Sequence, residues 1–210
     1  MGLNSKLIAS QTQPVKLYVG DFDKNDSIDQ VLTHWMGGKE YPFHTRDEMT
    51  KQMPSLKKRY LSYKKFSEAS IEDIFTSKQL SDAEQFTAYT FASVWVENLG
   101  DKKFEVHQLP KAAQMSTVKS FLVNDFDQDG ATDILLAGNL HRINIQLGRY
   151  DASYGLFLRG KEKGRFEAVP AVESGFSVKG EVRALRSFNL GNQVYYLAIR
   201  NNNTIEVFTQ

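Results

Sequence analysis

Short apolar and aromatic runs, separated by polar turns, dominate the pattern of the chain. The runs are rich in β-branched and aromatic residues and are bounded by Gly, Asn and Asp, which is typical of β-strands. The clearest of them cover residues 17–19, 94–97, 121–123, 134–136, 156–158 and 194–199. We therefore expect a mainly β protein built from hairpins.

One segment of this pattern occurs twice. Residues 17–23 read LYVGDFD and residues 121–127 read FLVNDFD, and each continues into a polar loop that ends at Asp29 or Asp133 before another apolar run. A degenerate third copy begins at residue 184 and has no carboxylate in the corresponding loop. Internal repetition at long spacing indicates a repeat architecture.

The second half of the unit also recurs. Residues 94–98 followed by 104–105 parallel residues 156–160 followed by 166–167. Each unit therefore predicts four strands in two successive hairpins, which is the composition of a propeller blade.

The first unit is longer than the second, and the excess falls at about residues 42–86. Sequences that resemble capping boxes predict helix starts in this insertion, namely Thr45-x-x-Glu48, Ser70-x-x-Asp73 and Ser81-x-x-Glu84. Apolar residues suit a helical face at Leu56, Tyr60, Leu61 and Tyr63. We predict two to four short helices here and expect the sheet of the first blade to form without them.

These patterns together predict a partial β-propeller of about three four-stranded blades, with a short helical insertion in the first blade. Within a single domain (1–210), we expect blade 1 at 15–109, blade 2 at 118–170 and an incomplete blade 3 at 181–209. Closed propellers typically have four to eight blades. We therefore expect the chain to be the C-terminal part of a longer protein, or to self-associate.

Composition narrows the functions to consider. The chain has 210 residues, a formal net charge of +1 and no cysteine. A charge so close to zero creates no overall field that would recruit nucleic acid or a membrane. The lack of cysteine excludes thiolate metal sites and cysteine nucleophiles. No apolar stretch approaches the length of a membrane span, and the N-terminus lacks the apolar run of a signal peptide, so a signal would lie upstream.

The second Asp-rich loop carries the clearest chemistry. It reads DFDQDGATD, with carboxylates at positions 1, 3, 5 and 9, which are Asp125, Asp127, Asp129 and Asp133. Gly130 allows a sharp turn at position 6, and the backbone carbonyl of Ala131 is the expected neutral ligand. Ca²⁺ takes six to eight oxygen ligands, so the loop predicts a Ca²⁺ site. Position 12 is Leu136 instead of Glu, which excludes an EF-hand.

The first loop repeats this pattern in a weaker form. It reads DFDKNDSID, and its expected ligands are Asp21, Asp23, Asn25, Ser27 and Asp29. Asp26 replaces the glycine of position 6, and Asp adopts a left-handed backbone less readily than Gly. The alternative for both loops is a metal-free turn held by side-chain to backbone hydrogen bonds. Repulsion among the clustered carboxylates argues against that alternative. Phe22 and Phe126, at position 2, are the expected core anchors of the loops.

The two loops resemble the FG-GAP or VCBS repeats of β-propellers, which are also found in integrin α subunits. Further segments are similar to bacterial propeller proteins of the ASPIC/UnbV-associated type, namely 46–48, 53–58, 71–75, 148–155 and 174–176. The resemblance covers about residues 15–209. It implies a Ca²⁺-bound propeller that is extracellular, on the cell surface or periplasmic, and it implies no single activity.

Other polar groups are weaker candidates. Arg149, Tyr150, Asp151 and Ser153 lie in a Gly-bounded loop of the second unit, where propellers often bind ligands. A turn stabilised by Asp151 and Ser153 is the simpler interpretation. The basic stretch between Glu48 and Glu68 suits a solvated helix face more than a docking site. The histidines show no metal-binding spacing.

We therefore expect a Ca²⁺-binding propeller module that acts as a binding or scaffold domain for a protein or glycan partner. The alternative is a fragment of a secreted or surface polysaccharide-active hydrolase with its active site on propeller loops. A hydrolase needs an acid and a base that face each other in a cleft. An Asp or Glu pair in a pocket outside the two loops would favour this alternative.

Overall fold

The structure is a computed structural model that describes residues 1–209, apart from the side chain of Lys163. It is mainly β, with four antiparallel sheets. The chain divides into two compact units, and we describe each by itself. The N-terminal unit is Leu7–Phe91, and the C-terminal unit combines Met1–Lys6 with Ala92–Gln210. None of the described helices has the length and apolar character needed to cross a lipid bilayer.

The sheet of the N-terminal unit has four strands in the order β3-β2-β1-β4. The strands are β1 (Val15–Gly20), β2 (Asp29–Met36), β3 (Lys39–Pro42) and β4 (Glu84–Ala88). The apolar runs that predict β1 and β2 are confirmed as strands. The predicted pairing differs at the edges. The place beside β2, where we expected residues 94–98, is taken by β3, and β4 adds a strand beside β1 at the opposite edge.

The insertion between β3 and β4 is helical, with five short helices where we expected two to four. The helices are α1 (Arg46–Gln52), α2 (Leu56–Arg59), α3 (Tyr63–Ser67), α4 (Ile71–Ile74) and α5 (Ser77–Asp82). The predicted capping boxes at Thr45 and Ser70 are confirmed. The one predicted at Ser81 is wrong, because Ser81 lies inside α5, and Thr76 with Gln79 forms the box that starts this helix.

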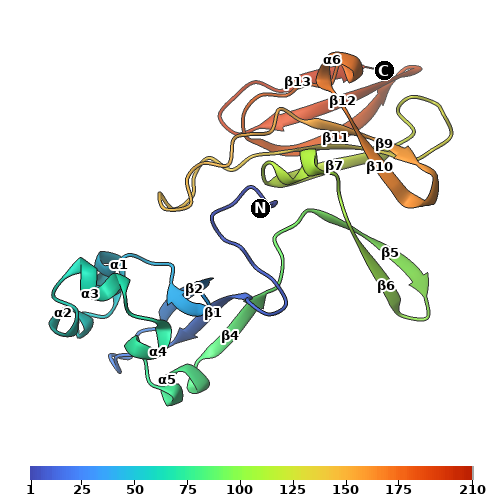
Figure 1. Ribbon diagram of the computed structural model, residues 1–210. Helices are drawn as coiled ribbons and strands as arrows, with labels where there is room; N and C mark the ends of the chain where they lie inside the picture. The colour runs from blue at the N-terminus through green and yellow to red at the C-terminus, as the bar shows by residue number, and fades with distance from the viewer. Residues whose placement is uncertain (210) are drawn as a thin grey trace. The chain divides into compact units, whose positions relative to one another are not determined.

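The helices belong to the core of the N-terminal unit, which argues against the expectation that the sheet forms without them. Tyr18, Phe22 and Val31 from the sheet side share one buried cluster with Met49 of α1 and Ile71 of α4. Figure 1 shows the helices gathered around the strands of this unit. Of the predicted apolar face, Leu56 and Tyr60 are buried, whereas Leu61 and Tyr63 are exposed. The sheet alone therefore lacks most of its apolar covering.

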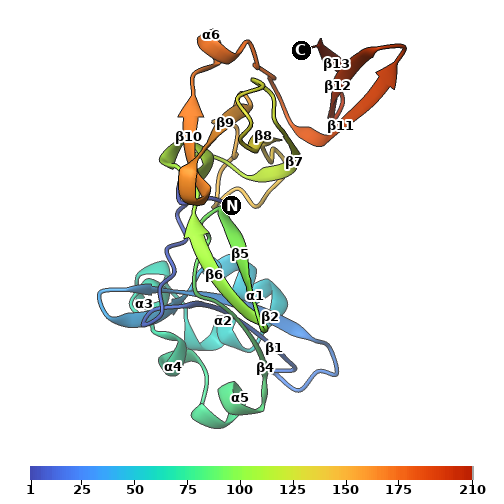
Figure 2. The same ribbon diagram turned by 90° about the vertical axis from the view of Figure 1, so that its right-hand side faces the viewer.

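The main sheet of the C-terminal unit has the predicted order of a four-stranded meander, β10-β9-β8-β7. The strands are β7 (Val118–Asn124), β8 (Asp133–Gly138), β9 (Leu156–Lys161) and β10 (Arg165–Val169). A second sheet contains β11 (Val182–Leu190), β12 (Gln193–Arg200) and β13 (Glu206–Thr209), as the third unit of the sequence predicts. Figure 2 shows these two sheets as separate elements, joined by a segment that contains α6 (Ala171–Ser174).

Apolar side chains of both sheets form one buried cluster. Leu135 and Phe157 of the main sheet share it with Val182, Leu185 and Ala198 of the second sheet. The remaining strands, β5 (Val94–Gly100) and β6 (Lys103–Gln108), form a two-stranded sheet of their own. Two short 3-10 helices, Lys111–Gln114 and Glu162–Gly164, complete the described elements of this unit.

Candidate metal loops and an adjoining aromatic cavity

Both Asp-rich loops occupy the same place in their sheets, at the turn between the first two strands of a repeat. Gly20 pairs with Asp29 at the end of the β1–β2 ladder, and Asn124 pairs with Asp133 at the end of the β7–β8 ladder. The pairing closes each loop at its ninth position. The sequence repeat therefore produces the same turn twice.

In the second loop, three carboxylates converge. Oxygen atoms of Asp125, Asp127 and Asp133 lie within 4.8 Å of one another. The first of these side chains also shapes the loop, because Asp125 Oδ1 accepts a hydrogen bond from the Asp129 amide at 3.1 Å and its Oδ2 accepts one from the Gly130 amide at 2.9 Å. The carboxylates are thus brought together by a turn that the same residues stabilise.

The first loop reproduces this geometry. Oxygen atoms of Asp21, Asp23 and Asp29 also lie within 4.8 Å of one another. Asp21 accepts hydrogen bonds at 3.0 Å from the amides of Asn25 and Asp26. Asp26 has a φ of 63°, in the left-handed region where Gly130 of the second loop has 88°. The substitution of Asp for Gly therefore changes the ease of the turn and leaves its shape in place.

The carboxylate at the ninth position of each loop accepts a hydrogen bond from the backbone amide at the second position of the same loop. Asp29 Oδ2 accepts a hydrogen bond from the Phe22 amide at 3.1 Å, and Asp133 Oδ2 accepts one from the Phe126 amide at 2.9 Å. Burial raises the pKa of the Asp29 carboxyl, and the nearby carboxylates of Asp23 and Asp21 raise it further. A bound cation would relieve this repulsion.

The side chains of Phe22 and Phe126 anchor the loops, as predicted. Phe22 is buried in the N-terminal core, and its ring centroid lies 4.4 Å from that of Phe75. Phe126 packs against the core cluster of the C-terminal unit and meets the rings of Phe157 and Tyr196 edge-on. Each loop is thus attached to a core through its second residue.

At position 5, the predicted ligand side chain accepts a hydrogen bond from the amide of position 7 in both loops. Asn25 Oδ1 accepts a hydrogen bond from the Ser27 amide at 2.8 Å, and Asp129 Oδ1 accepts one from the Ala131 amide at 2.8 Å. These contacts are turns of the Asx type. They give positions 5 and 7 the same arrangement in both loops.

The third position is where the two loops differ. Asp127 Oδ2 accepts a hydrogen bond from Arg159 Nε at 2.6 Å, and this contact raises the pKa of the Arg159 guanidinium. In the first loop, Asp23 Oδ1 is buried and has no hydrogen-bond partner among the described residues. An orphaned carboxylate oxygen is costly in a protein, and a cation at the centre of the loop would satisfy it.

The donor set fits a hard cation. Carboxylate, amide and backbone oxygens are the ligands that Ca²⁺ prefers, at about 2.3–2.6 Å. Three carboxylates that converge in one tight turn offer ligands of this type. The residues of both loops therefore fit Ca²⁺.

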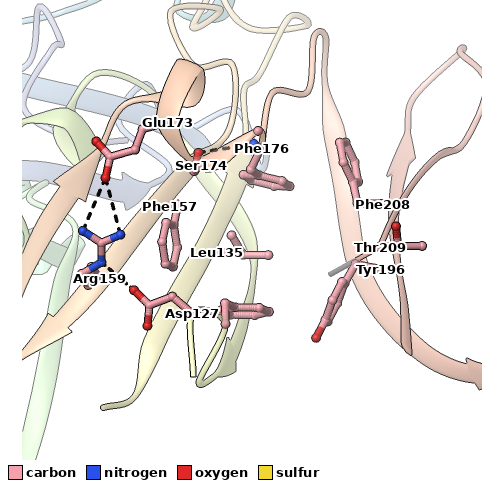
Figure 3. A pocket seen from close by; sticks show the side chains of 12 residues that line it. Asp127, Leu135, Phe157, Arg159, Glu173, Ser174, Phe176, Tyr196, Phe208 and Thr209 are labelled. Atoms are coloured by element: carbon pink, nitrogen blue, oxygen red, sulfur yellow. Dashed lines mark hydrogen bonds and ion pairs between the residues drawn. The ribbon is translucent and has the colours of Figure 1, made fainter. Parts of the chain in front are cut away.

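Arg159 connects the second loop to a cavity of about 320 Å³. Figure 3 shows Phe157 and Phe176 on one side of this cavity and Tyr196 and Phe208 on the other, with Arg159 reaching from β9 toward Asp127 and Glu173. Leu135 lies on the same side as Phe157 and Phe176. The cavity is therefore mainly aromatic and has one cation and two carboxylates at its rim. We call it the aromatic cavity.

The weaker candidates in the loop at 149–153 have mixed positions. Tyr150 is buried, and its hydroxyl lies 2.8 Å from Ser5 Oγ. Ser153 uses its backbone amide and carbonyl to bond the side chain of Asn139. Arg149 and Asp151 line a cavity of about 370 Å³, with 3.9 Å between Arg149 Nε and Asp151 Oδ2. Tyr150 and Ser153 thus hold the loop in place, whereas the side chains of Arg149 and Asp151 are exposed.

A further polar cluster lies on the β5–β6 sheet. Oxygen and nitrogen atoms of Glu97, Glu105 and His107 lie within 4.8 Å of one another, and the imidazole stacks on Trp95 with 4.4 Å between ring centroids. Cross-strand pairing brings them together, since Glu97 pairs with Glu105 and Trp95 with His107.

Sequence reasoning missed this cluster and the rim of the aromatic cavity. The alternation of Trp95 and Glu97 on one strand with Glu105 and His107 on the next is a signal for the cluster, once the hairpin register is assumed. Arg159 and Glu173 carry no local signal, because Arg159 meets Asp127 and Glu173 only through the packing of segments that are distant in the sequence.

Comparison of the chain with protein-family models, with curated proteins and with solved structures gives no match. The geometry of the loops and the cavity is therefore the basis for the functional proposals.

Proposed function

We propose that this protein is a calcium-binding module of the β-propeller repeat type, which binds one Ca²⁺ in each Asp-rich loop. One observation carries the proposal: two loops far apart in the sequence fold to the same geometry, and each brings three carboxylates within 4.8 Å. The buried, unpartnered oxygen of Asp23 supports it independently.

The order of strands supports the propeller part of the proposal. The meander β7–β10 has the four-stranded antiparallel order of a propeller blade, and β11–β13 gives three strands of a further one. The Asp-rich loop lies at the first turn of the meander, where the FG-GAP or VCBS resemblance places its metal. On this interpretation the protein works outside the cytoplasm as a binding or scaffold domain for a protein or glycan partner.

Calorimetric titration with Ca²⁺ tests the proposal. We expect two sites in the unmutated protein and one site in each of the matched variants Asp21→Asn and Asp125→Asn, because each removes one charge from one loop. Mg²⁺ should bind less well, since it demands a rigid octahedral site.

Thermal unfolding gives an independent readout. A ligand that binds only the folded state stabilises it by about 2.7 kcal/mol at 100 times its dissociation constant. We therefore expect a higher melting temperature in Ca²⁺ than in EDTA. Asp127→Ala should lower the melting temperature in Ca²⁺ and, because it also removes the contact with Arg159, to a smaller extent in EDTA. Equal melting temperatures of the unmutated protein in Ca²⁺ and EDTA would refute the proposal.

The hydrolase alternative gains no support from the rim of the aromatic cavity. Asp127 and Glu173 both line this cavity, but both carboxylates contact Arg159. A general acid and base would have to face a substrate between them. These two face a guanidinium of the same chain.

A further inference from the structure

The aromatic cavity and the second metal loop share one carboxylate. Asp127 is one of the three converging carboxylates of the second loop, with Asp125 and Asp133. Its Oδ2 accepts the hydrogen bond from Arg159 Nε at 2.6 Å. Arg159 also lines the cavity. A cation in the loop therefore competes with the guanidinium for the negative charge of Asp127.

The outer end of Arg159 is held only loosely. Its two terminal nitrogens both lie 3.5 Å from Glu173 Oε1, which is the long limit for a hydrogen bond. The Glu173 side chain is 58% exposed, so solvent screens this ion pair. A guanidinium binds a carboxylate best as a planar, two-pronged pair. The terminal nitrogens of Arg159 can therefore bind a carboxylate, and Glu173 binds them only weakly.

The walls of the cavity suit an apolar body. Phe157, Phe176 and Tyr196 are largely buried, and Phe176 and Phe208 have ring centroids 5.3 Å apart. The cavity volume is about 320 Å³. Since an apolar cavity of about 150 Å³ accepts benzene, this one has room for a body of one or two rings.

We propose that the aromatic cavity binds an organic carboxylate with an aromatic body, and that Ca²⁺ in the second loop strengthens this binding. The inference rests on the proposed function, because it takes Ca²⁺ as the ion that Asp127 binds. The ligand carboxylate displaces Glu173 from the terminal nitrogens of Arg159, and its ring packs among Phe157, Phe176 and Phe208. Ca²⁺ draws the charge of Asp127 away from Arg159 and leaves the guanidinium more positive toward the ligand. By linkage, the ligand strengthens Ca²⁺ binding by the same factor.

If the cavity bound an organic cation instead, the expected changes in affinity would have the opposite signs. Without Ca²⁺, Asp127 and Glu173 together exceed the charge of Arg159, and aromatic rings attract cations. An organic cation would therefore bind better in EDTA, would bind worse to Glu173→Gln and would bind better to Arg159→Gln. The signs of these changes separate the two classes.

The test is calorimetric titration with 3-phenylpropionate in Ca²⁺ and in EDTA, with 3-phenylpropionamide as the matched neutral ligand. We expect tighter binding of the acid in Ca²⁺ and at least about tenfold weaker binding to Arg159→Gln, since charged hydrogen bonds are lost. Glu173→Gln, an exposed substitution, should bind the acid more tightly. A peptide that ends in a free Phe carboxylate, compared with its amide, tells a peptide terminus from a free acid as the source of the ligand.

The first loop supplies the control for the coupling. Asp21→Asn removes its Ca²⁺ site and should leave the affinity for 3-phenylpropionate unchanged, whereas Asp125→Asn should abolish the Ca²⁺ effect. Ca²⁺ binding to both loops without binding of the acid would overturn this inference and leave the calcium module intact. No Ca²⁺ binding would overturn the proposed function and the coupling with it. Equal affinity of the acid in Ca²⁺ and EDTA would also overturn the coupling.

Discussion

Asp133 joins the second Asp-rich loop to strand β9, because its Oδ1 accepts a hydrogen bond from the Gly160 amide at 2.7 Å. The same carboxylate closes the loop through the Phe126 amide. Gly160 can approach this closely only because it lacks a side chain. A Cβ atom at this position would lie 2.2 Å from the carbonyl oxygen of Thr132. The second Asp-rich loop is therefore packed tightly against β9 at Gly160.

Gly160→Ala should destabilise the C-terminal unit by about 1–3 kcal/mol, because the new methyl group forces the loop and β9 apart. It should weaken Ca²⁺ binding at the second loop as well, since Asp133 moves with the loop. Urea unfolding and calorimetry measure the two effects. The matched control is Gly20→Ala in β1, whose new Cβ would make an ordinary contact of 3.5 Å with Ala83. A Gly160→Ala protein as stable as the control would show that β9 can move freely.

Met49→Ala tests whether the helices support the N-terminal unit. Met49 lies in α1, is 1% exposed and shares a core cluster with Tyr18, Phe22 and Val31. We expect a loss of about 2–5 kcal/mol in the free energy of unfolding, as for other buried large-to-alanine changes. Leu61→Ala is the control, because Leu61 is 80% exposed. Similar small losses in both variants would mean that the sheet folds independently of the helices.

The local features of this fold could be predicted from the sequence. The turns of the two Asp-rich loops, the Phe anchors and the capping boxes at Thr45 and Ser70 depend on residues that are close in the sequence, so their pattern is visible in the chain. The failed capping box at Ser81 has the right letters but lies within α5, because Thr76 and Gln79 already start the helix one turn earlier.

The long-range features could not be predicted in the same way. The similarity of residues 94–98 to residues 156–160 predicts that they complete the first blade beside β2, but β3 pairs with β2 and takes that edge. Edge positions depend on competition between segments, and local pattern does not rank the competitors. The contact between Arg159 and Asp127 likewise depends on the register of β9 against β8.

The stability of the N-terminal unit should fall as the pH drops below about 6.5. Burial lowers the pKa of His34, and burial also lowers the pKa of His44 against a smaller opposing effect of Glu48. The unfolded chain, with a histidine pKa of about 6.5, binds more protons than the folded unit in this range. The free energy of unfolding is therefore highest above this pH and declines as the pH falls through it.

Urea unfolding at about pH 7.5 and about pH 5.5 measures this effect, with Trp35 as the reporter in a Trp95→Phe background. His44→Gln should reduce the pH dependence, because it removes an imidazole whose Nδ1 is buried without a hydrogen-bond partner among the described residues. His141→Gln, in the other unit, is the control and should leave the dependence unchanged. The same pH dependence in His44→Gln would place its origin elsewhere.

The two-stranded sheet gives the prediction of self-association a specific location. Among the described strands, β5 and β6 pair only with each other. One face of their hairpin carries Val94, Val96, Phe104 and Val106, all of them exposed. An apolar sheet face next to unpaired strand edges favours association. We therefore expect the isolated chain to self-associate through this hairpin at micromolar concentration.

Sedimentation of the unmutated protein and of Val96→Lys tests this. Val96 is 53% exposed and pairs with Val106 at the centre of the apolar face, so a lysine there should shift the protein toward the monomer. Ile145→Lys is the control, because Ile145 is 95% exposed and lies outside the hairpin. A monomeric unmutated protein that binds no hydrophobic dye would contradict the prediction. Association that persists in Val96→Lys and not in Ile145→Lys would move the contact to the segment around Ile145.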